Sequence, residues 1–423
     1  MRTRLTILLV LVSSAWAQPG GKHWVATWTT AQPLIRNQPA APRPAGQNGP
    51  SAPAPPPTTP RPANPAQALA RGFHDQTVRM IVRTSIGGSA LRIKLSNPFG
   101  GAPVMIGTAN VAVRSKESDI IPTSGHALSF NGKPGCTIGP GMVIFSDAVD
   151  MAVSSQTDLA VSLYLPGETG PPSAHNGLHT SYVGKEGDLT SAATIPDAIA
   201  APNYYWLAGI DVLAPANASL VVAYGDSITE GARSTPDTDR MWPAVLSARL
   251  ASNKSTAQIA VANMGIGGNR VLRDGSGASA LARFDRDVLS QSGVKWVMML
   301  EGINDIGHSN TEPVSADDLI GAFKQIIERA HTHGVRVIGC TLPPYEGAGY
   351  AREEGEAIRQ ALNSWIRTGK AFDAVVDFEA ATRDPNNPKK LRADFDPGDH
   401  LHPNDAGYKA MAEAVDLSIF TRK

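Results

Sequence analysis

Short apolar or alternating runs follow one another through the first half of the chain, and Gly, Pro and Asn residues separate them. No segment between these runs places apolar residues at helical spacing, so the pattern predicts strands throughout this part. We therefore expect a β-rich domain of the sandwich or jelly-roll-like type. The predicted strands span residues 24–28, 77–85, 90–96, 104–113, 142–145 and 159–165.

The pattern changes near residue 214. From there, short apolar runs alternate with longer segments whose apolar residues recur every three or four positions. This alternation predicts a parallel sheet with helices on both faces. In such sheets the chemistry gathers at the carboxyl ends of the strands, so the loops after the strands are the places to search. The predicted strands span 220–224, 258–262, 296–300, 335–340 and 374–378, and the clearest helices span 315–332 and 353–367.

These two patterns divide the chain into a β-rich domain at residues 18–214 and an α/β domain at residues 215–423. A chain of 423 residues, 42% of them hydrophobic, is long enough to give each domain its own core. Within the first domain, residues 38–66 are rich in Pro, Ala and Gly and lack aromatic side chains. Such a segment buries too little apolar surface to become ordered, so we expect a disordered or polyproline-like loop there.

Residues 1–17 have the features of a secretory signal peptide. Two arginines precede the apolar run 5–12, and Ala15-Trp16-Ala17 supplies a cleavage site with small residues. The apolar run is too short to span a bilayer, and no cysteine lies beside the cleavage site to carry a lipid. The sequence therefore predicts export to the periplasm or the extracellular space, with an uncleaved membrane anchor as the alternative.

Charge and cysteine content exclude several functional classes. Lys and Arg together number 38, as do Asp and Glu, so no field of one sign favours nucleic acid or an anionic membrane. A neutral or modestly polar substrate fits this balance best. Cys136 and Cys340 are the only cysteines, which excludes a zinc site made of cysteines. Two free thiols are favoured over a disulfide between the two predicted domains, and no metal or cofactor is expected.

Ser227 is the first candidate for catalysis. It lies in the segment 225–231, with the sequence Gly-Asp-Ser-Ile-Thr-Glu-Gly, directly after the strand predicted at 220–224. This position is the carboxyl end of a strand and the start of a helix, where free N–H groups favour a developing anion. The segment differs from the G-x-S-x-G turn of α/β-hydrolases. Taken alone, it reads more readily as a turn in which Asp or Ser caps the next helix.

Two later loops provide candidate hydrogen-bond donors for the same reaction. Residues 263–269 (Asn-Met-Gly-Ile-Gly-Gly-Asn) form a glycine-rich turn that would expose backbone N–H groups. Asn304, after the strand predicted at 296–300, would offer a side-chain amide. With the N–H of Ser227, these donors would make an oxyanion hole. A dinucleotide-binding loop is disfavoured, because the glycine spacing and the downstream acid of that motif are missing.

The last motif supplies a base and an acid. Asp399 and His402 lie three residues apart, and Pro403 after them favours the first turn of a helix predicted at 405–417. An imidazole suits general base catalysis near neutral pH, and Asp399 would orient the ring. His400 is the competing imidazole, but an adjacent Asp-His pair would direct its side chains apart. The alternative is structural, with Asp399 capping a turn and His402 packing.

These four segments resemble the four sequence blocks of the SGNH/GDSL hydrolase superfamily, in the same order. The resemblance covers roughly residue 219 to the C-terminus. It implies a flavodoxin-like three-layer α/β/α domain and an ester-hydrolysing triad of Ser227, His402 and Asp399. It also implies an oxyanion hole formed by the N–H groups of Ser227 and Gly268 and by the Asn304 amide. The β-rich region is similar to the amino-terminal half of a bacterial two-domain branch of this superfamily, a similarity that assigns it no chemistry.

A few other polar and aromatic residues are weaker candidates. A charge cluster after the glycine turn is interpreted as a structural ion-pair network, with a substrate anion clamp as the alternative. Trp242 and Tyr345 would stack on a substrate or, more commonly for such residues, pack in the core. His308 follows the Asn304 loop and would lie near the cleft. The charge cluster comprises Arg270, Arg283, Asp285, Arg286 and Asp287.

The sequence thus predicts an exported serine ester hydrolase that acts through an acyl-enzyme on small-molecule or polysaccharide esters. Removal of O-acetyl groups from carbohydrates is the leading expectation, by analogy at the level of the fold. A lipolytic esterase, a lysophospholipase and an acyltransferase are alternatives with the same residues. A carbohydrate-binding protein with an inert hydrolase fold is the alternative that is not an enzyme. We expect no nucleic-acid partner and no stable membrane insertion, and the oligomeric state is left open.

Overall fold

The structure is a computed structural model of the whole chain, and it describes residues 21–34 and 69–422. The predicted signal peptide at 1–17 and the predicted loop at 38–66 lie outside these residues. In the described ranges, no helix is long and apolar enough to cross a membrane.

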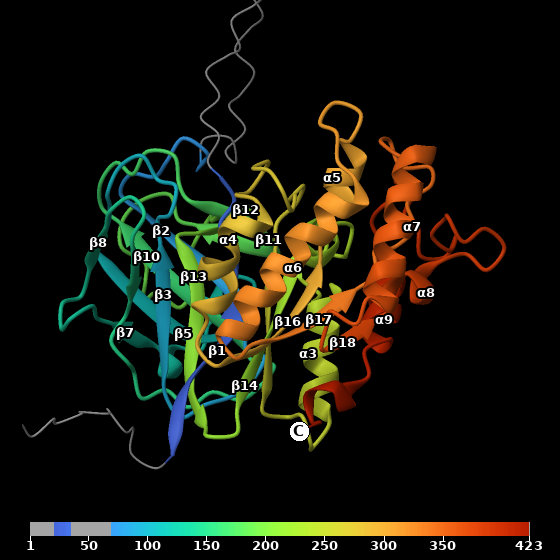
Figure 1. Cartoon of the computed structure of the whole chain (residues 1–423). Coiled ribbons are helices and arrows are strands. Elements are labelled where there is room, and N and C mark those ends of the chain that lie inside the picture. The colour runs from blue at the N-terminus through green and yellow to red at the C-terminus, as the bar shows by residue number, and fades with distance from the viewer. Residues whose placement is uncertain (1–20, 35–68, 423) are drawn as a thin grey trace, which may run out of the picture.

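Strands β1 to β13 form antiparallel sheets, as the alternating runs predicted (Figure 1). One sheet has four strands in the order β1-β13-β3-β9: β1 (Lys22–Thr29), β13 (Leu207–Pro215), β3 (Leu91–Ser96) and β9 (Val143–Phe145). A second has the order β12-β11-β2-β10-β5-β6, with β7 beside β5: β12 (Ile199–Tyr205), β11 (Ala174–Val183), β2 (Gln76–Arg83), β10 (Asp158–Leu165), β5 (Thr108–Lys116), β6 (Asp119–Ile120) and β7 (His126–Leu128). A two-stranded sheet joins β4 (Val104–Ile106) to β8 (Cys136–Ile138), and a short 3-10 turn covers Pro122–Ser124. We call this part the β-rich half.

Two details of the β-rich half differ from the sequence prediction. The run predicted at 104–113 is split into β4 and β5 at Gly107, where a Cβ atom would come within 2.9 Å of the Tyr164 ring. Strands β6, β7, β8, β11, β12 and β13 were not predicted. In β11 and β13, buried polar side chains hide the apolar pattern, among them His175 and Asp211, at 5% and 1% exposure.

The second half contains one five-stranded sheet in the order β15-β14-β16-β17-β18, and every pair in it is parallel. The sequence prediction of five strands alternating with helices is therefore confirmed. Numbered within this half, the order is 2-1-3-4-5, which is the order of flavodoxin-like doubly wound sheets. The strands are β14 (Ser219–Gly225), β15 (Ile259–Gly265), β16 (Val294–Leu300), β17 (Arg336–Cys340) and β18 (Ala374–Val376). We call this part the α/β half.

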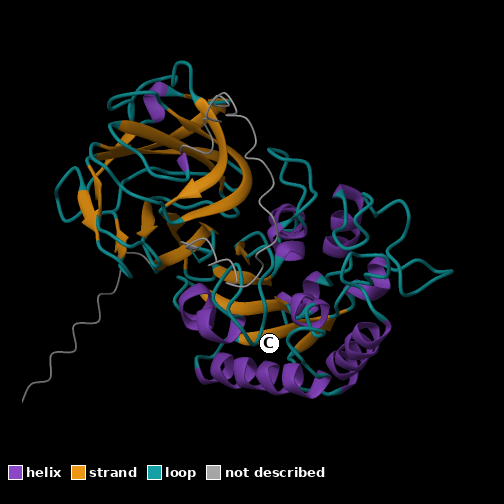
Figure 2. Ribbon diagram, turned by 90° about the horizontal axis from the view of Figure 1, so that it is seen from above, coloured by secondary structure: helices purple, strands orange, loops and turns teal. Residues whose placement is uncertain are grey.

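Helices surround the parallel sheet (Figure 2). The longest, α6 (Ala316–Thr332), begins at Ser315, whose hydroxyl accepts from the N–H of Asp318 while the Asp318 carboxylate accepts from the N–H of Ser315. This capping box explains why the helix starts where the sequence predicted. The others are α2 (Ser227–Glu230), α3 (Trp242–Ser252), α4 (Ala280–Phe284), α5 (Ile303–Gly307), α7 (Glu353–Thr368), α8 (Phe378–Thr382) and α9 (Asp405–Glu413), with a π-helical turn at Asp285–Leu289 and a 3-10 turn at Leu417–Phe420.

The two halves share a hydrophobic core. Strand β1 of the β-rich half lies against β15, and its Ala26 N–H donates to the carbonyl of Ser292 in the α/β half at 2.9 Å. Val25 is fully buried, and a Cβ atom on Gly293 would come within 3.0 Å of its methyl groups. The four-stranded sheet of the β-rich half therefore packs directly on the parallel sheet through β1. Cys136 and Cys340 are free, and only Cys340 is fully buried.

Candidate active site

Ser227 is the first residue of helix α2, directly after strand β14. Asp226 caps this helix, because its carboxylate accepts from the N–H of Ile228 at 2.9 Å. Gly231 ends the helix with φ +107°, a conformation that glycine adopts without steric cost. Ser227 is therefore held between a capped helix start and the carboxyl end of a buried strand, and it is 8% exposed.

The structure brings His402 and Asp399 to Ser227, although they are far away in the sequence. His402 Nε2 lies 2.8 Å from Ser227 Oγ, and His402 Nδ1 lies 2.9 Å from Asp399 Oδ2. The other oxygen of Asp399 accepts from the backbone N–H of His402 at 3.0 Å. With Nδ1 protonated toward Asp399, Nε2 is an acceptor for the Ser227 hydroxyl. The three side chains form an unbroken hydrogen-bonded chain.

The carboxylate of Asp399 is strongly stabilised in its charged form. Partial burial alone would raise the pKa of Asp399, but hydrogen bonds from His402, Arg233 and the Leu401 N–H outweigh burial and hold that pKa well below its usual range. Arg233 Nε donates to Asp399 Oδ2 at 2.8 Å, so the same oxygen is shared by Arg233 and the His402 ring. Asp399 is therefore a stable anion facing the imidazole.

The competing imidazole, His400, does not reach Ser227. It pairs instead with the carboxylate of Asp396, and its side chain is about half exposed. Asp396 also accepts from the N–H groups of Gly398 and His400, at 2.8 and 3.0 Å. The chain thus carries two adjacent Asp-His pairs, and only the pair of Asp399 and His402 faces the serine.

The glycine turn and Asn304 lie at the same edge of the sheet. Ile266 N–H donates to the carbonyl of Gly225 at 3.0 Å, which ties the turn to the residue two positions before Ser227. Asn304 Nδ2 donates to the carbonyl of Asn269 at 3.0 Å, next to Gly268. This bond uses one of the two amide hydrogens of Asn304. Within the described part of the chain, the backbone N–H groups of Ser227 and Gly268 have no protein acceptor.

Arg283, fully buried, joins the loops that carry these candidate residues. Its guanidinium donates to the carbonyls of Gly225 and Met264, both at 2.8 Å, and to Asn269 Oδ1 at 2.7 Å. It also pairs with the carboxylates of Glu301 and Asp287, each at 3.1 Å. The loop before Ser227, the glycine turn and the loop before Asn304 therefore share one cation.

The other members of the charge cluster are also paired with carboxylates. The structure thus supports the ion-pair network and not the substrate clamp. The pairs are Arg270 with Glu312, Arg286 with Asp287 at 2.7 Å, and Asp285 with Arg329 at 2.6 Å.

Three buried carboxyl groups lie behind the serine. Burial raises the pKa of Asp226 to about 7 and the pKa of Glu301 well above its usual value. Burial also raises the pKa of Asp305, although hydrogen bonds from the N–H groups of Val271 and Leu272 act in the opposite direction. Such perturbed groups collect at functional sites more often than elsewhere. Here Asp226 lies in the motif of Ser227, and Glu301 and Asp305 lie in the loop that carries Asn304.

The aromatic candidates pack in the interior. Trp242 is fully buried, with its ring centroid 5.3 Å from that of Phe378, and Tyr345 is 1% exposed. His308 Nδ1 lies 2.8 Å from the carbonyl of Asn304. The residue that sequence analysis missed here is Tyr350, whose hydroxyl lies 3.3 Å from Asn304 Oδ1.

Arg233, the partner of Asp399, was also missed. It lies six residues after Ser227 in a loop without a recognisable pattern, and no local spacing relates it to the C-terminal motif.

Within residues 21–34 and 69–422, no cluster of three or more His, Cys, Asp or Glu side chains has the arrangement of a metal site.

The fold and the site define a doubly wound α/β protein with a Ser-His-Asp hydrogen-bonded chain at the carboxyl edge of its sheet. A family model described as GDSL-like Lipase/Acylhydrolase family matches residues 223–410. The α/β half therefore belongs to this family and to the SGNH/GDSL superfamily, as the four motifs predicted. A search of curated proteins found no match.

Several solved structures are similar to this chain. A G-D-S-L family protein from Desulfitobacterium hafniense DCB-2 is 26% identical over 46% of this chain and 97% of its own, with a TM-score of 0.36. An acetyl xylan esterase, AlAXEase, is 23% identical over 46% of this chain and 96% of its own, with a TM-score of 0.36. A mutant acetyl-xylooligosaccharide esterase from Geobacillus Stearmophilus is 22% identical over 48% of this chain and 95% of its own, with a TM-score of 0.38.

Proposed function

We propose that this protein is a serine ester hydrolase that cleaves carboxylic esters through an acyl-enzyme. The observation that supports it is the chain from Ser227 Oγ through His402 to Asp399, with contacts of 2.8 and 2.9 Å. Ser227 attacks the ester carbonyl carbon while His402 Nε2 takes the hydroxyl proton, and Asp399 stabilises the imidazolium. His402 then gives that proton to the leaving alkoxide.

Deacylation repeats these steps with water. His402 takes a proton from a water molecule, the resulting hydroxide adds to the acyl carbon, and the proton returns to Ser227 Oγ as the acid leaves. The oxyanion in both steps is held by the N–H groups of Ser227 and Gly268 and by the Asn304 amide. Support comes from these two backbone N–H groups, which find no acceptor among the described residues, and from the second amide hydrogen of Asn304.

The proposed enzyme is exported. Residues 1–17 would be removed as a signal peptide, residues 18–214 would form the β-rich domain, and residues 215–423 would form the hydrolase domain. The change from antiparallel to parallel pairing between Pro215 and Ser219 supports this boundary. The proposed substrates are esters with a small acyl group, with O-acetylated carbohydrates as the leading class.

The test combines active-site labelling with variants. A fluorophosphonate should label Ser227, and Ser227→Ala should lose p-nitrophenyl acetate hydrolysis by about 10⁶-fold in kcat while staying folded. His402→Gln should lose both the fluorophosphonate labelling and the ester hydrolysis. The matched variant His400→Gln should keep kcat within about twofold of wild type. A folded Ser227→Ala variant with full activity would disprove the proposal. Failure to label, combined with tight glycan binding, would favour an inert hydrolase fold.

The acyl group is tested separately with p-nitrophenyl esters of increasing chain length and with acetylated xylan. We expect the highest kcat/KM with acetate and release of acetic acid from the polymer. A preference for long acyl chains would instead identify a lipolytic enzyme. Transfer of the acyl group to an added alcohol, in preference to water, would identify an acyltransferase.

A further inference from the structure

The β-rich half reaches the chain directly after Ser227 through an irregular part of strand β11. Pairing of β11 with β12 shifts register between Asn176 and Ser181, and Leu178 between them has φ +57°. The carbonyl of Leu178 accepts from the N–H of Asp237 at 2.9 Å, and Thr180 N–H donates to the Asp237 carboxylate at 2.7 Å. This bulge of β11 therefore binds the loop that follows helix α2.

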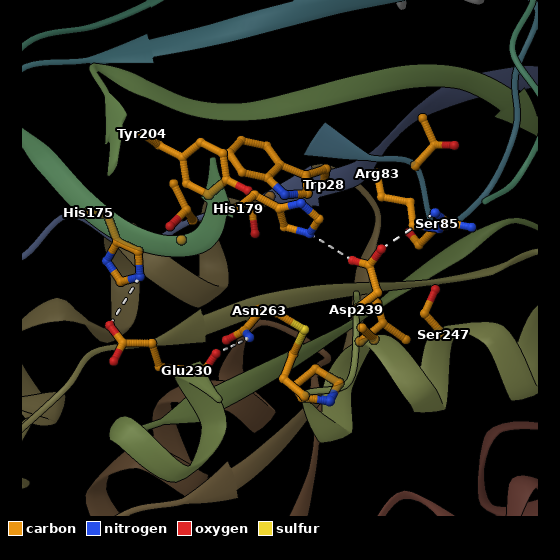
Figure 3. A pocket seen from close by; sticks show the side chains of 18 of the residues that line it. Trp28, Arg83, Ser85, His175, His179, Tyr204, Glu230, Asp239, Ser247 and Asn263 are labelled. Carbon is orange, nitrogen blue, oxygen red and sulfur yellow. Dashed lines mark hydrogen bonds and ion pairs between the residues drawn. The ribbon is translucent and has the colours of Figure 1, made fainter. Parts of the chain in front are cut away.

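One side chain of this strand contacts helix α2 itself. His175 Nε2 lies 3.3 Å from Glu230 Oε1, and the side chains are 6% and 16% exposed (Figure 3). Glu230 is the last residue of the helix that begins at Ser227. The contact borders a cavity of about 90 Å³ between the two halves. His175 thus links the β-rich half to the element that carries the proposed nucleophile.

Glu230 in turn lies against the glycine turn. The N–H of Gly267 faces its carboxylate and stabilises the charged form. A Cβ atom on Gly267 would come within 2.9 Å of Glu230 Oε2, so the turn and the carboxylate are in close contact. The backbone end of α2 is held as well, because Asn263 Nδ2 donates to the carbonyls of Thr229 and Glu230, at 2.9 and 3.3 Å. Gly268, the next residue in the turn, has φ +70°.

We propose that Glu230 is a positioning residue that fixes the glycine turn, and that His175 holds Glu230 in place from the β-rich half. This inference rests on the proposed function, in which the N–H of Gly268 stabilises the oxyanion. The β-rich half is then part of the catalytic unit, because one of its side chains determines where an oxyanion donor lies. Neither Glu230 nor His175 touches the reacting atoms in this scheme.

The bridge does not require a full ion pair. Burial raises the pKa of Glu230 to about 7, and burial together with Arg283 lowers the pKa of His175 to about 4. When Glu230 is charged, neutral His175 with its proton on Nε2 donates to the carboxylate. When Glu230 is protonated or replaced by glutamine, His175 with its proton on Nδ1 accepts at Nε2 from the carboxyl or amide group. Glutamine at either position should therefore keep the bridge, while apolar side chains should break it.

The first test compares Glu230→Ala with Glu230→Gln on p-nitrophenyl acetate. Oxyanion donors act in the transition state, and misplacement by about 1 Å costs about 10²-fold, so kcat in the alanine variant should fall about 10–100-fold. KM should stay within about twofold, and glutamine should recover kcat to within about threefold of wild type. The matched control is Ser247→Ala. It removes a hydrogen bond of 2.9 Å from Gln156 Nε2, which also joins the two halves beside this cavity, and it should leave kcat unchanged.

The second test approaches the bridge from the β-rich half. His175→Leu should lower kcat about tenfold with KM unchanged, and His175→Gln should restore it, because the Gln amide places a nitrogen near the position of Nε2. The double variant His175→Leu with Glu230→Ala should be no slower than Glu230→Ala alone, since both changes break one pathway. Thermal unfolding of each variant accompanies the kinetics, and only variants that remain folded are compared.

Two results would overturn the inference: wild-type kcat in folded Glu230→Ala, or fully additive losses in the double variant. Fluorophosphonate labelling of Ser227 separates this outcome from failure of the proposed function. If the wild-type protein neither reacts with the label nor hydrolyses the ester, the proposed function fails. If the wild type is active and the Glu230 variants are equally active, only the inference fails.

Discussion

Both halves of the molecule bury arginines completely, and Arg79 of the β-rich half is held in a different way from Arg283 of the α/β half. In the β-rich half, Arg79 donates to Ser162 Oγ at 2.8 Å and to four backbone carbonyls. Among the described residues, no carboxylate lies within ion-pair distance of it, and burial lowers the pKa of Arg79 to about 10. The carbonyls belong to Ser118, Leu189, Thr190 and Ala192.

In the α/β half, Arg283 meets two carboxylates as well as carbonyls. Burial alone would lower the pKa of Arg283, but Tyr224, Asp287 and Glu301 raise it. Both arginines gather loops that are far apart in the sequence. The difference is that the β-rich half does so with neutral dipoles, whereas the α/β half concentrates charge at the edge of the sheet where the four motifs meet. Buried charge there is expensive, which is typical of sites selected for chemistry and not for stability.

The largest effect should come from the acid of the hydrogen-bonded chain. In Asp399→Asn, the amide oxygen still accepts from the backbone N–H groups, but the amide nitrogen faces His402 Nδ1 and favours the wrong tautomer. We expect kcat to fall by about 10⁴-fold, and thermal unfolding to shift to a lower temperature because the stabilised charge of Asp399 is lost. Steady-state kinetics on p-nitrophenyl acetate measures this loss.

Its matched control is Asp396→Asn in the neighbouring Asp-His pair. Because His400 does not face Ser227, kcat should stay within about twofold of wild type. Equal losses in the two variants would mean that the acids act only by shaping this loop.

The second effect concerns the shared cation. Arg283→Met leaves Glu301 buried without its arginine and takes one of two arginines from Asp287, which keeps Arg286. The free energy of unfolding should therefore fall by about 3–5 kcal/mol. Urea unfolding measures this change, and any folded fraction should hydrolyse the ester poorly, because three loops lose their common anchor. Arg329→Met removes a partly exposed guanidinium from Asp285 and should cost only about 1 kcal/mol. If the two variants were equally stable, the network around Arg283 would contribute no more than a surface ion pair.

The third effect is a pH dependence that Asp226 in the α/β half should show and that Asp188 in the β-rich half should not. Burial raises the pKa of Asp226 to about 7 in the folded protein, so the stability it contributes is complete below about pH 4 and is lost as the pH rises through about 7. Asparagine does not titrate, so Asp226→Asn should gain stability relative to wild type over this window. The gain should reach on the order of 4 kcal/mol, at about 1.4 kcal/mol per pKa unit.

Unfolding titrations from pH 4 to pH 8 test this sign. The control from the β-rich half is Asp188→Asn. Burial opposes ionisation there, but bonds from Thr108 and Thr190 lower the pKa of Asp188 overall, so its contribution is lost only in more acidic solution. The difference in free energy of unfolding between Asp188→Asn and wild type should therefore stay constant from about pH 5 to pH 8. If the difference in free energy of unfolding from wild type changed with pH in both variants, the proposed electrostatic difference between the halves would be wrong.

The smallest effect should come from Arg79, the buried arginine of the β-rich half. Arg79→Met leaves neutral carbonyls without a donor, and the free energy of unfolding should fall by about 1–3 kcal/mol. Since Arg79 contacts no motif residue, kcat of the folded variant should remain within about twofold of wild type. A loss of kcat comparable to that of Arg283→Met would show that the two arginines are functionally equivalent.

The local features of the fold were predictable from the sequence. Strands β14 to β18 and helix α6 were predicted because apolar periodicity and capping signals are local, and Ser315 marks the start of α6. The family followed from four short motifs. By contrast, β11 and β13 were missed, since each buries polar side chains, including His175 and Asp211, whose partners come from distant segments.

The site was predictable as a set of residues but not as a geometry. Spacing favoured His402 over His400 as the base, yet no local pattern indicated that Arg233 would share Asp399. The same holds for Arg283, for which the cluster predicted ion pairs but not its contacts with three loops. The contact between His175 and Glu230 joins different halves of the chain, so it depends on tertiary packing alone.

Strand β1 has a consequence for the order in which the protein folds. It is the first described element of the chain, yet Lys22 pairs with Pro215, at the far end of β13. The four-stranded sheet therefore cannot close until nearly half of the polypeptide is available, and contacts of such high sequence separation form slowly. Because β1 also packs against β15, closure of the four-stranded sheet completes the core that the two halves share. A chain whose sheet forms late stays unfolded for longer. This property is compatible with export, because we propose that the protein crosses a membrane before it folds.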